Sequence, residues 1–485
     1  MELPSEPPVG EGPSIPSLTR WIIAVDVGST TTKGACFERR DEGLVLRAVE
    51  HAPTTVEKPF EDVTIGLDEA IRRLGEVVGE KFGTGEAGGS GGKGRPDVTL
   101  VATSSAGGGL QMLACGTTQR FSASSAHRAA MGAGAIVLAT LSPDDGLSLA
   151  QKADLVRDLR PDMVLMGGGF DGGEVPSFIA ELADLLRTAR PRPRLGDSFR
   201  IPLVYAGNDA GHELVEDVLG EQFIIHRVAN LAPGPRKENP GPAREAIHRL
   251  FQQHVMSQAP GYGKLLARVA APVLPTPGAV AKAVDLAAKT WGRDVLAFDI
   301  GGATTDVFSV RRGRLARSVS ANLGMSYSAL NVLQRAGLDR LLRWLPGDDA
   351  TAVTAAVANK TLHPTTLPET AFELRVEQAV AREALWLALE DHVEMAGGGL
   401  SDGPGVPLVI GSGGVLSFAP RQEQVVDILA DAVGAGRAVE VAVDDRFLLP
   451  QVGALSTVAP GLAVEVLERH SVKRLATVHG RGDKR

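Results

Sequence analysis

The chain has 485 residues, a formal net charge of −8 at pH 7, and a composition that is 44% hydrophobic and 22% charged. A single hydrophobic core stops growing near roughly 250–300 residues, so this length predicts two globular domains. The negative charge argues against a nucleic-acid surface, because phosphate binding needs a basic stripe and the sequence shows none.

The N-terminal segment 1–18 is acidic and rich in proline. It lacks the basic and apolar parts of a secretion signal, so we expect a disordered leader there. No stretch of the chain approaches the about 18 apolar residues that span a bilayer. The two cysteines, Cys36 and Cys115, build neither a disulfide framework nor a four-cysteine zinc site. We therefore expect a cytoplasmic protein with Cys36 in a core.

The first strand pattern lies at 21–28, where the apolar run WIIAVDVG stops at a glycine. Two short strands follow at 34–39 and 44–52, separated by the turn RRDEG, which predicts an antiparallel meander of three strands. A helix is expected at 64–82, and the low-complexity segment 83–96 is expected to be a mobile loop.

Three later segments, 98–109, 161–173 and 201–211, each run from an apolar stretch into glycine. This pattern is typical of strands that cross over through helices within a parallel sheet.

A second copy of the opening pattern begins at 294–302, where DVLAFDIGG is again an apolar run that ends at an acidic residue and glycines. Short strands follow it at 306–313 and 314–324. An internal repeat of this size predicts two related domains. We expect a leader at 1–18, a first domain with insertions at 19–285, a second domain at 286–470, and a tail at 471–485.

The second half continues with a predicted helical region at 350–396. Strands are expected again at VPLVIGSGG, residues 406–414, and at AVEVAVDD, residues 438–445.

The two acidic glycine turns carry the chemistry. Carboxylates at strand ends can hold Mg²⁺ through its water ligands, so Asp26 and Asp299 are the predicted metal-binding and catalytic residues. Backbone N–H groups in such turns can form a nest for phosphate, provided that the residues are small. The predicted phosphate-binding residues are Gly28, Ser29, Thr30 and Thr31 in the first turn, and Gly301, Gly302, Thr304 and Thr305 in the second.

Two residues near these turns admit more than one interpretation. Asp306 is a catalytic candidate that orients or deprotonates an attacking water, or else it caps local N–H groups at a strand start. Lys33 follows the first turn, and strand alternation favours a salt-bridged surface position over a phosphate contact.

A third glycine motif, VIGSGG at 409–414, follows the second turn. Adenine and ribose are expected to lie against Gly411, Ser412, Gly413 and Gly414. This order of two phosphate loops and an adenosine loop resembles the superfamily of acetate and sugar kinases, Hsp70 and actin. The resemblance implies an α/β fold of two RNase H-like domains with ATP or ADP and Mg²⁺ in the cleft between them. It also implies that PQVGALSTVAPG, residues 450–461, forms the hinge of domain closure.

Segments outside these loops carry a narrower resemblance over about residues 20 to 460. VATSSAGGGLQMLACG, SSAHRAAMGAGA, VLMGGGFDGG with VYAGND, PAREAIHRLFQQHV with PTPGAV, and NLGMSYSALNVL are similar to the GlmL (also called MutL) accessory proteins of adenosylcobalamin-dependent glutamate mutase and related aminomutases. The resemblance implies an ATP-driven reactivating chaperone whose partner is a mutase that holds damaged cobalamin. The chain has no DxHxxG string, so we expect it to hold no cobalamin itself.

Other functions stay open at this point. An ATP-dependent activator of 2-hydroxyacyl-CoA dehydratases places an iron–sulfur cluster between two subunits, and two cysteines per chain satisfy that count. A small-molecule kinase of the same superfamily transfers phosphate to a substrate. A scaffold that binds ATP without hydrolysing it is the third alternative, and the sequence leaves the oligomeric state open.

Overall fold

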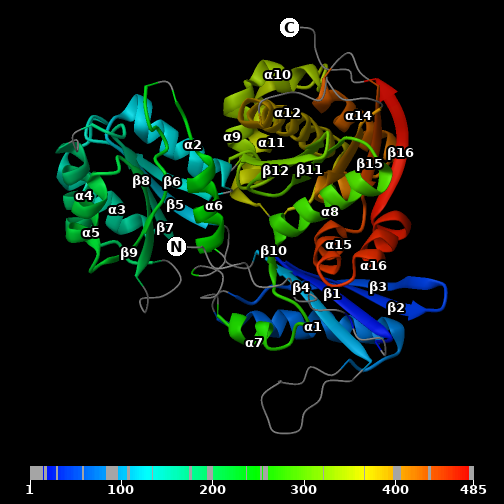
Figure 1. Cartoon of the computed structure of the whole chain (residues 1–485). Helices are drawn as coiled ribbons and strands as arrows, with labels where there is room; N and C mark the ends of the chain where they lie inside the picture. The colour runs from blue at the N-terminus through cyan, green and yellow to red at the C-terminus, as the bar shows by residue number, and fades with distance from the viewer. Residues whose placement is uncertain are drawn as a thin grey trace.

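The computed structural model describes residue 15, residue 254 and the ranges 19–28, 31–56, 59–82, 97–105, 110–133, 135–173, 177–193, 200–235, 237–251, 260–320, 322–364, 366–396, 406–434 and 438–479. The predicted loop 83–96, and the predicted leader apart from Ile15, lie outside these residues. Within them the strands form three sheets (Figure 1). None of the helices in these ranges combines the length and the apolar content that crossing a bilayer requires.

The first sheet is built around β1 (Trp21–Val27), in which every residue is buried. On one side β1 pairs antiparallel with β2 (Thr31–Arg40), which pairs antiparallel with β3 (Gly43–Pro53). On the other side β4 (Val98–Ser104) pairs parallel with β1, and β10 (Leu274–Pro275) pairs parallel with β4. The predicted meander is confirmed, and the strand order is β3-β2-β1-β4-β10.

Helix α1 (Val63–Val78) covers one face of this sheet, and its buried leucines pack against Ile23 and Val25. The Asp62 side chain accepts from the N–H of Thr64 at the helix start. The helix ends four residues before its predicted limit of 82, because Gly79 takes a left-handed backbone at φ 72°.

The second sheet repeats this order. Its strands are β11 (Val295–Ile300), β12 (Thr305–Arg311), β13 (Arg314–Ser320), β14 (Leu408–Ser412), β15 (Ala438–Asp444) and β16 (Val472–His479). They lie in the order β13-β12-β11-β14-β15-β16, with an antiparallel meander followed by two parallel strands. The first five strands match the first sheet one for one. The predicted fold class, two RNase H-like units in one α/β chain, is therefore confirmed.

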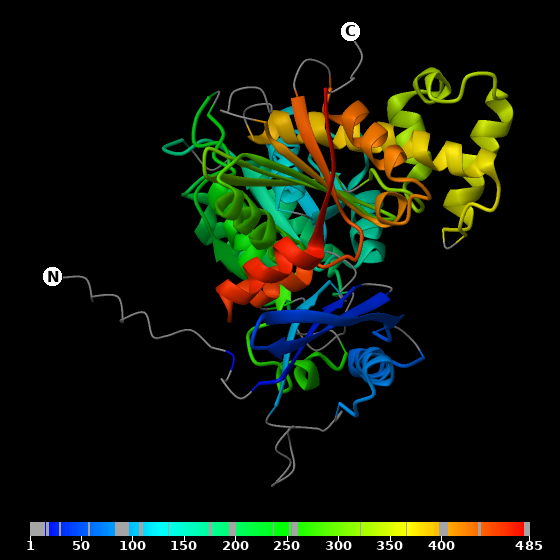
Figure 2. The same ribbon diagram turned by 90° about the vertical axis from the view of Figure 1, so that its right-hand side faces the viewer.

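Helices cover one face of the second sheet, and those drawn in yellow and yellow-green in Figure 2 protrude from it. They share a core with Phe298 and Val307. These helices are α9 (Ala329–Ala336), α10 (Leu338–Arg343), α11 (Ala350–Leu362), α12 (Ala371–Ala396) and α14 (Gln422–Val433).

Three helices lie between the first and second sheets, α8 (Thr276–Trp291), α15 (Leu449–Ser456) and α16 (Pro460–Val466) (Figure 2). One continuous core joins them to Ile22 of the first sheet and Phe308 of the second. A Cβ added at Gly453 of α15 would stand 1.9 Å from the carbonyl oxygen of Ala279 in α8. The backbones of the two helices therefore touch where they cross.

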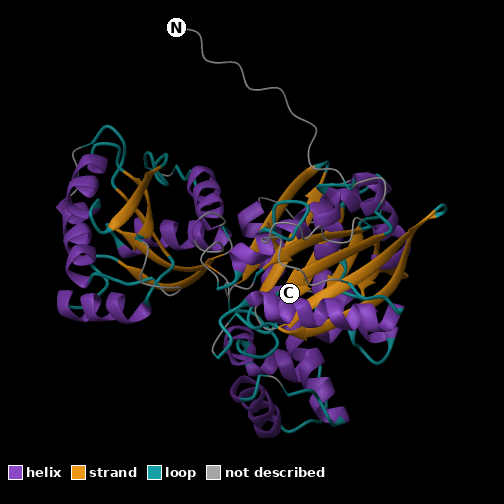
Figure 3. Ribbon diagram, turned by 90° about the horizontal axis from the view of Figure 1, so that it is seen from below, coloured by secondary structure: helices purple, strands orange, loops and turns teal. Residues whose placement is uncertain are grey.

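The third sheet forms a separate lobe, seen on the left in Figure 3. All its strands are parallel, in the order β6-β5-β7-β8-β9. They are β5 (Leu110–Gly116), β6 (Ala135–Leu141), β7 (Met163–Gly168), β8 (Ile201–Gly207) and β9 (Phe223–Arg227). We call the region from Leu110 to Leu250 the inserted lobe, because the chain leaves the first sheet after β4 and returns to it at β10.

Both faces of the inserted sheet are covered, which is the usual state of a parallel sheet. Helices α2 (Ser124–Gly132) and α6 (Gly241–Leu250) pack on one face. Helices α3 (Leu149–Leu159), α4 (Ser177–Ala189) and α5 (Gly211–Leu219) pack on the other.

The structure differs from the sequence predictions in three places. The strand at 98–104 belongs to the first sheet, whereas its supposed parallel companions β7 and β8 belong to the inserted lobe. Strands β5, β6 and β9 were not predicted. Residues Val472–His479, expected in a tail, form β16 and pair antiparallel with β15.

Candidate functional site

The two acidic turns are closed by the same backbone hydrogen bond. The N–H of Gly28 donates to the carbonyl oxygen of Thr31 at 3.1 Å, and the N–H of Gly301 donates to that of Thr304 at 2.8 Å. A Cβ at Gly28 would stand 2.6 Å from the Thr31 oxygen, so this turn requires glycine. Ser29 and Thr30 lie outside the described residues.

Asp26 is buried at the end of β1. Its Oδ1 accepts hydrogen bonds from the hydroxyls of Thr103 in β4 at 2.8 Å and Thr276 in α8 at 2.6 Å. Burial raises the pKa of Asp26 above its ordinary value, against the lowering effects of Lys33 and the two threonines. The carboxylate is thus held in one position by two neighbouring elements.

Asp299 occupies the matching position in β11. Burial is the main reason that its pKa rises to about 6, and the charges of Asp306 and Asp26 add to the rise. The charge of Lys33 and a hydrogen bond from Ser412 oppose it. The charge of Asp26 acts on the pKa of Asp299, and Lys33 acts on both carboxyl groups, so the fold brings the two predicted metal-binding carboxylates near one another.

Asp306 lies directly opposite Asp299 in the β11–β12 ladder. Its Oδ1 accepts two hydrogen bonds from Arg317 of β13, at 2.9 Å from Nε and 2.7 Å from Nη2. The local capping role considered for Asp306 gives way to an ion pair with Arg317, and its carboxylate belongs to the same charged group as Asp299.

The surface position predicted for Lys33 is wrong. Its ammonium lies 4.1 Å from the centre of the Phe447 ring, on the opposite side of the cleft. It also acts on the pKa values of Asp26 and Asp299. Alternation correctly places Lys33 and Asp26 on one face of the sheet, since the two pair across the β1–β2 ladder. At Lys33 that face borders the cavity between the two units rather than open solvent.

The second turn is braced by the following segment, residues 322–328. The carbonyl oxygens of Gly301 and Gly302 accept from the N–H groups of Met325 and Ser326, each at 2.9 Å. A Cβ at Gly302 would meet the Ser326 hydroxyl at 2.5 Å. These contacts hold the second turn in one conformation.

Two of the predicted phosphate-binding threonines take different roles. The Thr305 hydroxyl is buried and donates to the carbonyl oxygen of Leu323 at 2.6 Å, so it fastens the brace. Thr304 remains at the turn, where its carbonyl closes the bond to Gly301. In the first turn, Thr31 lines the cavity described below.

The residues of the glycine motif at the end of β14 also have different roles. A Cβ at Gly411 would collide with Leu416 and Leu429, so Gly411 packs the core and does not reach the cleft. Gly413, at φ 113°, lies against the carbonyl oxygen of Ile300 and brings the loop onto the second turn. Gly414 is open on its Cβ side and lines the cavity, while Ser412 bonds to Asp299.

Sequence reasoning missed Asp444, the fully buried residue that ends β15. Its two carboxylate oxygens accept from the N–H groups of Leu448 and Leu449, both at 2.9 Å, at the start of α15. Burial raises its pKa to about 7, with a contribution from Asp299. An apolar strand that ends in an acidic pair, AVEVAVDD, was the available signal.

A cavity of about 770 Å³ lies between the two RNase H-like units and reaches Thr31, Lys33 and Gly414, while the buried carboxylates of Asp26 and Asp299 are not part of its lining. Such a volume is typical of sites for small ligands and cofactors. One wall is made by β2 and β3, and the other by the loops after β14 and β15. Its lining comprises Thr31, Lys33, Leu46, Arg47, Ala48, Val49, Glu50, His51, Gly414, Phe418, Asp445, Arg446 and Phe447.

Protein side chains alone do not form a metal cage here. Among the residues that the structure describes, no group of three or more His, Cys, Asp or Glu side chains is arranged to hold a metal ion. Two separated carboxylates instead fit a hydrated Mg²⁺ that takes its other ligands from water and phosphate.

The cysteines do not favour an intersubunit cluster. Cys36 in β2 and Cys115 in β5 are both fully buried, in different cores. Burial raises the pKa of each thiol to about 12. Cys36 is the core residue that the sequence predicted.

These features define a class and then a family. Two RNase H-like units that face each other across acidic glycine turns are the fold of the actin and Hsp70 type of ATPase. A family model described as "MutL protein" matches residues 22–471, and the chain belongs to that family.

Individual relatives were also found. The chain is 29% identical to "Protein MutL" of Clostridium tetanomorphum over 93% of its own length and 99% of that protein's. Among solved structures it is similar to a nucleotide-free acetone carboxylase, with a TM-score of 0.43 and 13% identity over 90% of this chain and 70% of that one. It is also similar to a nucleotide-free diol dehydratase-reactivating factor, with a TM-score of 0.33 and 11% identity over 90% of this chain and 99% of that one.

Proposed function

We propose that the chain is an ATPase that serves as an accessory, reactivating chaperone for an adenosylcobalamin-dependent mutase, glutamate mutase or a related aminomutase. The observation that carries the ATPase part is the pair of matched turns, with Asp26 close enough for its charge to act on Asp299. Membership in the MutL family supports the client.

In this proposal the nucleotide lies in the cavity between the two units. Asp26 and Asp299 hold magnesium through its water ligands, and the bound ion supplies positive charge against the phosphates. The N–H group of Gly302 in the second turn faces the phosphate oxygens, whereas the N–H of Gly28 already closes the first turn. Lys33 leaves the Phe447 ring to add a second positive charge.

The other side chains position water and adenosine. Asp306, fixed by Arg317, orients the attacking water, and phosphoryl transfer needs little more than such positioning and charge. Gly413 and Gly414 form the flat floor for adenine and ribose. Hydrolysis changes the charge between the units, and α8 and α15, which join their cores, carry the resulting movement to the client.

The test is a reactivation assay. An inactivated adenosylcobalamin aminomutase is mixed with the protein, ATP, Mg²⁺ and fresh coenzyme, and recovered mutase activity is followed. We expect recovery with the wild type and with the Asp285→Ala control, whose carboxylate pairs with Lys289 on the surface of α8. We expect none with Asp299→Ala. Recovery without ATP, or equal recovery with Asp299→Ala, contradicts the proposal.

A further inference from the structure

The inserted lobe exposes large apolar side chains along one edge of its sheet. Each lies on the connection that leaves the carboxyl end of β5, β6 or β7, or in the first turn of the helix that follows it, and these three strands are neighbours in the sheet. Their exposed fractions run from 38% to 54%. We call this set the apolar edge; it comprises Phe121, Leu147, Leu149, Phe170 and Phe178. Exposed apolar side chains gathered on one surface mark contact sites more often than isolated ones do.

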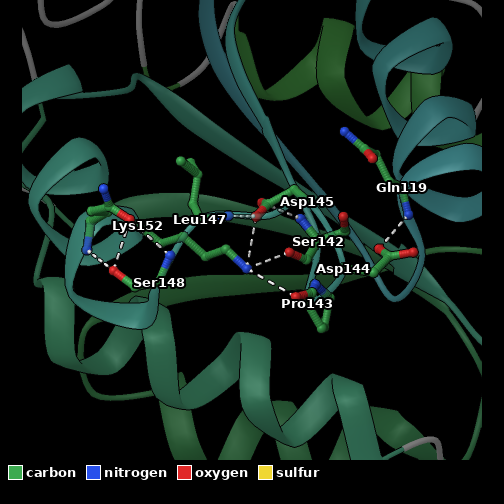
Figure 4. A network of polar contacts seen from close by, with 9 residues as sticks. Gln119, Ser142, Pro143, Asp144, Asp145, Leu147, Ser148 and Lys152 are labelled. Atoms are coloured by element: carbon green, nitrogen blue, oxygen red, sulfur yellow. Dashed lines mark hydrogen bonds and ion pairs between the residues drawn. The ribbon is translucent and has the colours of Figure 1, made fainter.

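The backbone behind the apolar edge is fixed by a buried ion pair (Figure 4). Lys152 is only 3% exposed, and its Nζ lies 3.0 Å from Oδ1 of Asp145. The same Nζ donates to the carbonyl oxygen of Ser142 at 2.6 Å. Asp145 in turn accepts from the N–H of Leu147 at 2.9 Å, while the Leu147 side chain points away from the polar network.

The connections after β5, β6 and β7 are also joined to one another. The Asp144 Oδ1 accepts from the N–H of Gln119, on the connection after β5, at 2.7 Å. The rings of Phe121 and Phe170 meet edge to face, with centroids 5.9 Å apart, and so join the connections after β5 and β7. A surface held in one conformation loses little conformational entropy on binding, which favours a docking role.

The charges around the apolar edge narrow the choice of occupant. Among the described residues of these connections, the exposed charged side chains are Asp144, Asp171 and Arg120, an acidic balance once Lys152 has neutralised Asp145. An acidic rim repels nucleic acid and anionic lipid. A two-fold contact between copies of this chain brings the same patch against itself, with two acidic side chains and one basic side chain from each copy, so its charges are poorly matched.

We infer that the apolar edge is the surface on which the client mutase docks, through a patch with an apolar centre and basic side chains at its rim. This inference rests on the proposed function. It gives the inserted lobe the task of holding the client, while the two RNase H-like units hold the nucleotide.

The test compares two double variants of the full chain. Leu149→Gln/Phe178→Gln changes the first residue of α3 and the second residue of α4, where glutamine is compatible with a helix. The control, Leu362→Gln/Leu367→Gln, changes leucines that are 75% and 81% exposed on the second unit. Binding to a purified adenosylcobalamin aminomutase is measured by calorimetry, and the association state of each variant by sedimentation.

Removal of two apolar contacts at the centre of an interface should raise the Kd by about 10-fold or more. The control should bind the mutase as the wild type does, and both variants should keep the stabilisation by Mg·ADP. Affinity should fall as salt is raised, because a basic rim meets an acidic one. Equal affinity of the two double variants overturns the inference.

Two further outcomes would overturn the inference. A wild-type dimer that the apolar-edge variant converts to a monomer, with mutase binding unchanged, assigns the edge to a second copy of this chain. Failure of the wild type to bind the mutase in any nucleotide state overturns the proposed function itself, and the docking role with it.

Discussion

Arg317 donates two hydrogen bonds to a single oxygen of Asp306, at 2.9 Å from Nε and 2.7 Å from Nη2. Only 19% of the Arg317 side chain and 13% of the Asp306 side chain are exposed. Arg317 therefore fixes the carboxylate that lies opposite Asp299. Its strand, β13, also packs against α2, so the inserted lobe contacts the strand that carries this arginine.

The Arg317→Met variant should retain Mg·ADP binding but hydrolyse ATP at least about 10-fold more slowly, because Asp306 loses the partner that orients it. Loss of a bonded partner from a mostly buried carboxylate should also cost about 1–3 kcal/mol of stability. The control is Arg314→Met, an exposed position on the same strand. Phosphate release and chemical denaturation measure the two effects. Hydrolysis as fast as in the control contradicts the positioning role.

The raised pKa of Asp299, about 6 against an ordinary 3.8, makes stability depend on pH. The folded state therefore binds the carboxyl proton of Asp299 more tightly than the unfolded state does. The stability that this carboxyl group contributes to the folded state is therefore fully present below about pH 4, and it is lost as the pH rises through about 6. The rise of the Asp299 pKa from 3.8 to about 6 limits this contribution to the free energy of unfolding to about 3 kcal/mol.

In EDTA without nucleotide, Asp299→Asn should accordingly lose less stability between about pH 4 and about pH 7 than the wild type does. Asp285→Asn, on the surface of α8, serves as the control. The measurement is the free energy of unfolding by denaturant at each pH. Parallel curves for Asp299→Asn and the wild type would show that Asp299 ionises normally.

Mg·ADP should stabilise the wild type by about 2.7 kcal/mol at roughly 100-fold saturation, since only the folded state binds it. Asp26→Asn should reduce this gain, because it removes one of the two carboxylates proposed to hold magnesium. EDTA should reduce the gain for the wild type in the same way. Thermal unfolding with ADP alone and with Mg·ADP gives the measurement, and an absent shift in the wild type contradicts nucleotide binding itself.

Gly453→Ala should destabilise the protein by about 1–3 kcal/mol, because its Cβ has no room at the crossing of α15 with α8. Gly461→Ala is a matched control on α16, where nothing lies within 4 Å of the added Cβ. Thermal denaturation compares the two variants. If both melt at the same temperature, the helices separate more easily than the contact between Gly453 and Ala279 indicates.

How much the sequence predicted depends on whether a pattern is repeated. The turns at Asp26 and Asp299 were recognisable because each ends an apolar strand and opens a meander, so one copy supports the other. Asp444 ends a similar strand but has no second copy. Asp444 accepts hydrogen bonds from the N–H groups of Leu448 and Leu449. Only the folded structure shows these contacts, so the sequence could not reveal them.

Lys33 shows a second limit. A period of two residues gives the face of the sheet on which a side chain lies, but it does not say what covers that face. Phe447, which receives the Lys33 ammonium, is more than 400 residues away in the chain. Gly411 shows a third limit, because a glycine that packs a helix and a glycine that admits a ligand look alike in sequence.

The attachment of the inserted lobe has a consequence for modularity. Ser104, where the chain leaves the first sheet, lies beside Pro275, where it returns. The lobe lies inside this excursion, and neighbouring ends are the arrangement in which a domain can be gained or removed, provided that α7 (Tyr262–Leu266), which packs in the core of the first sheet, is kept. If the proposed function holds, a short linker in place of Leu110–Leu250 should leave a core that is still stabilised by Mg·ADP but no longer binds the mutase.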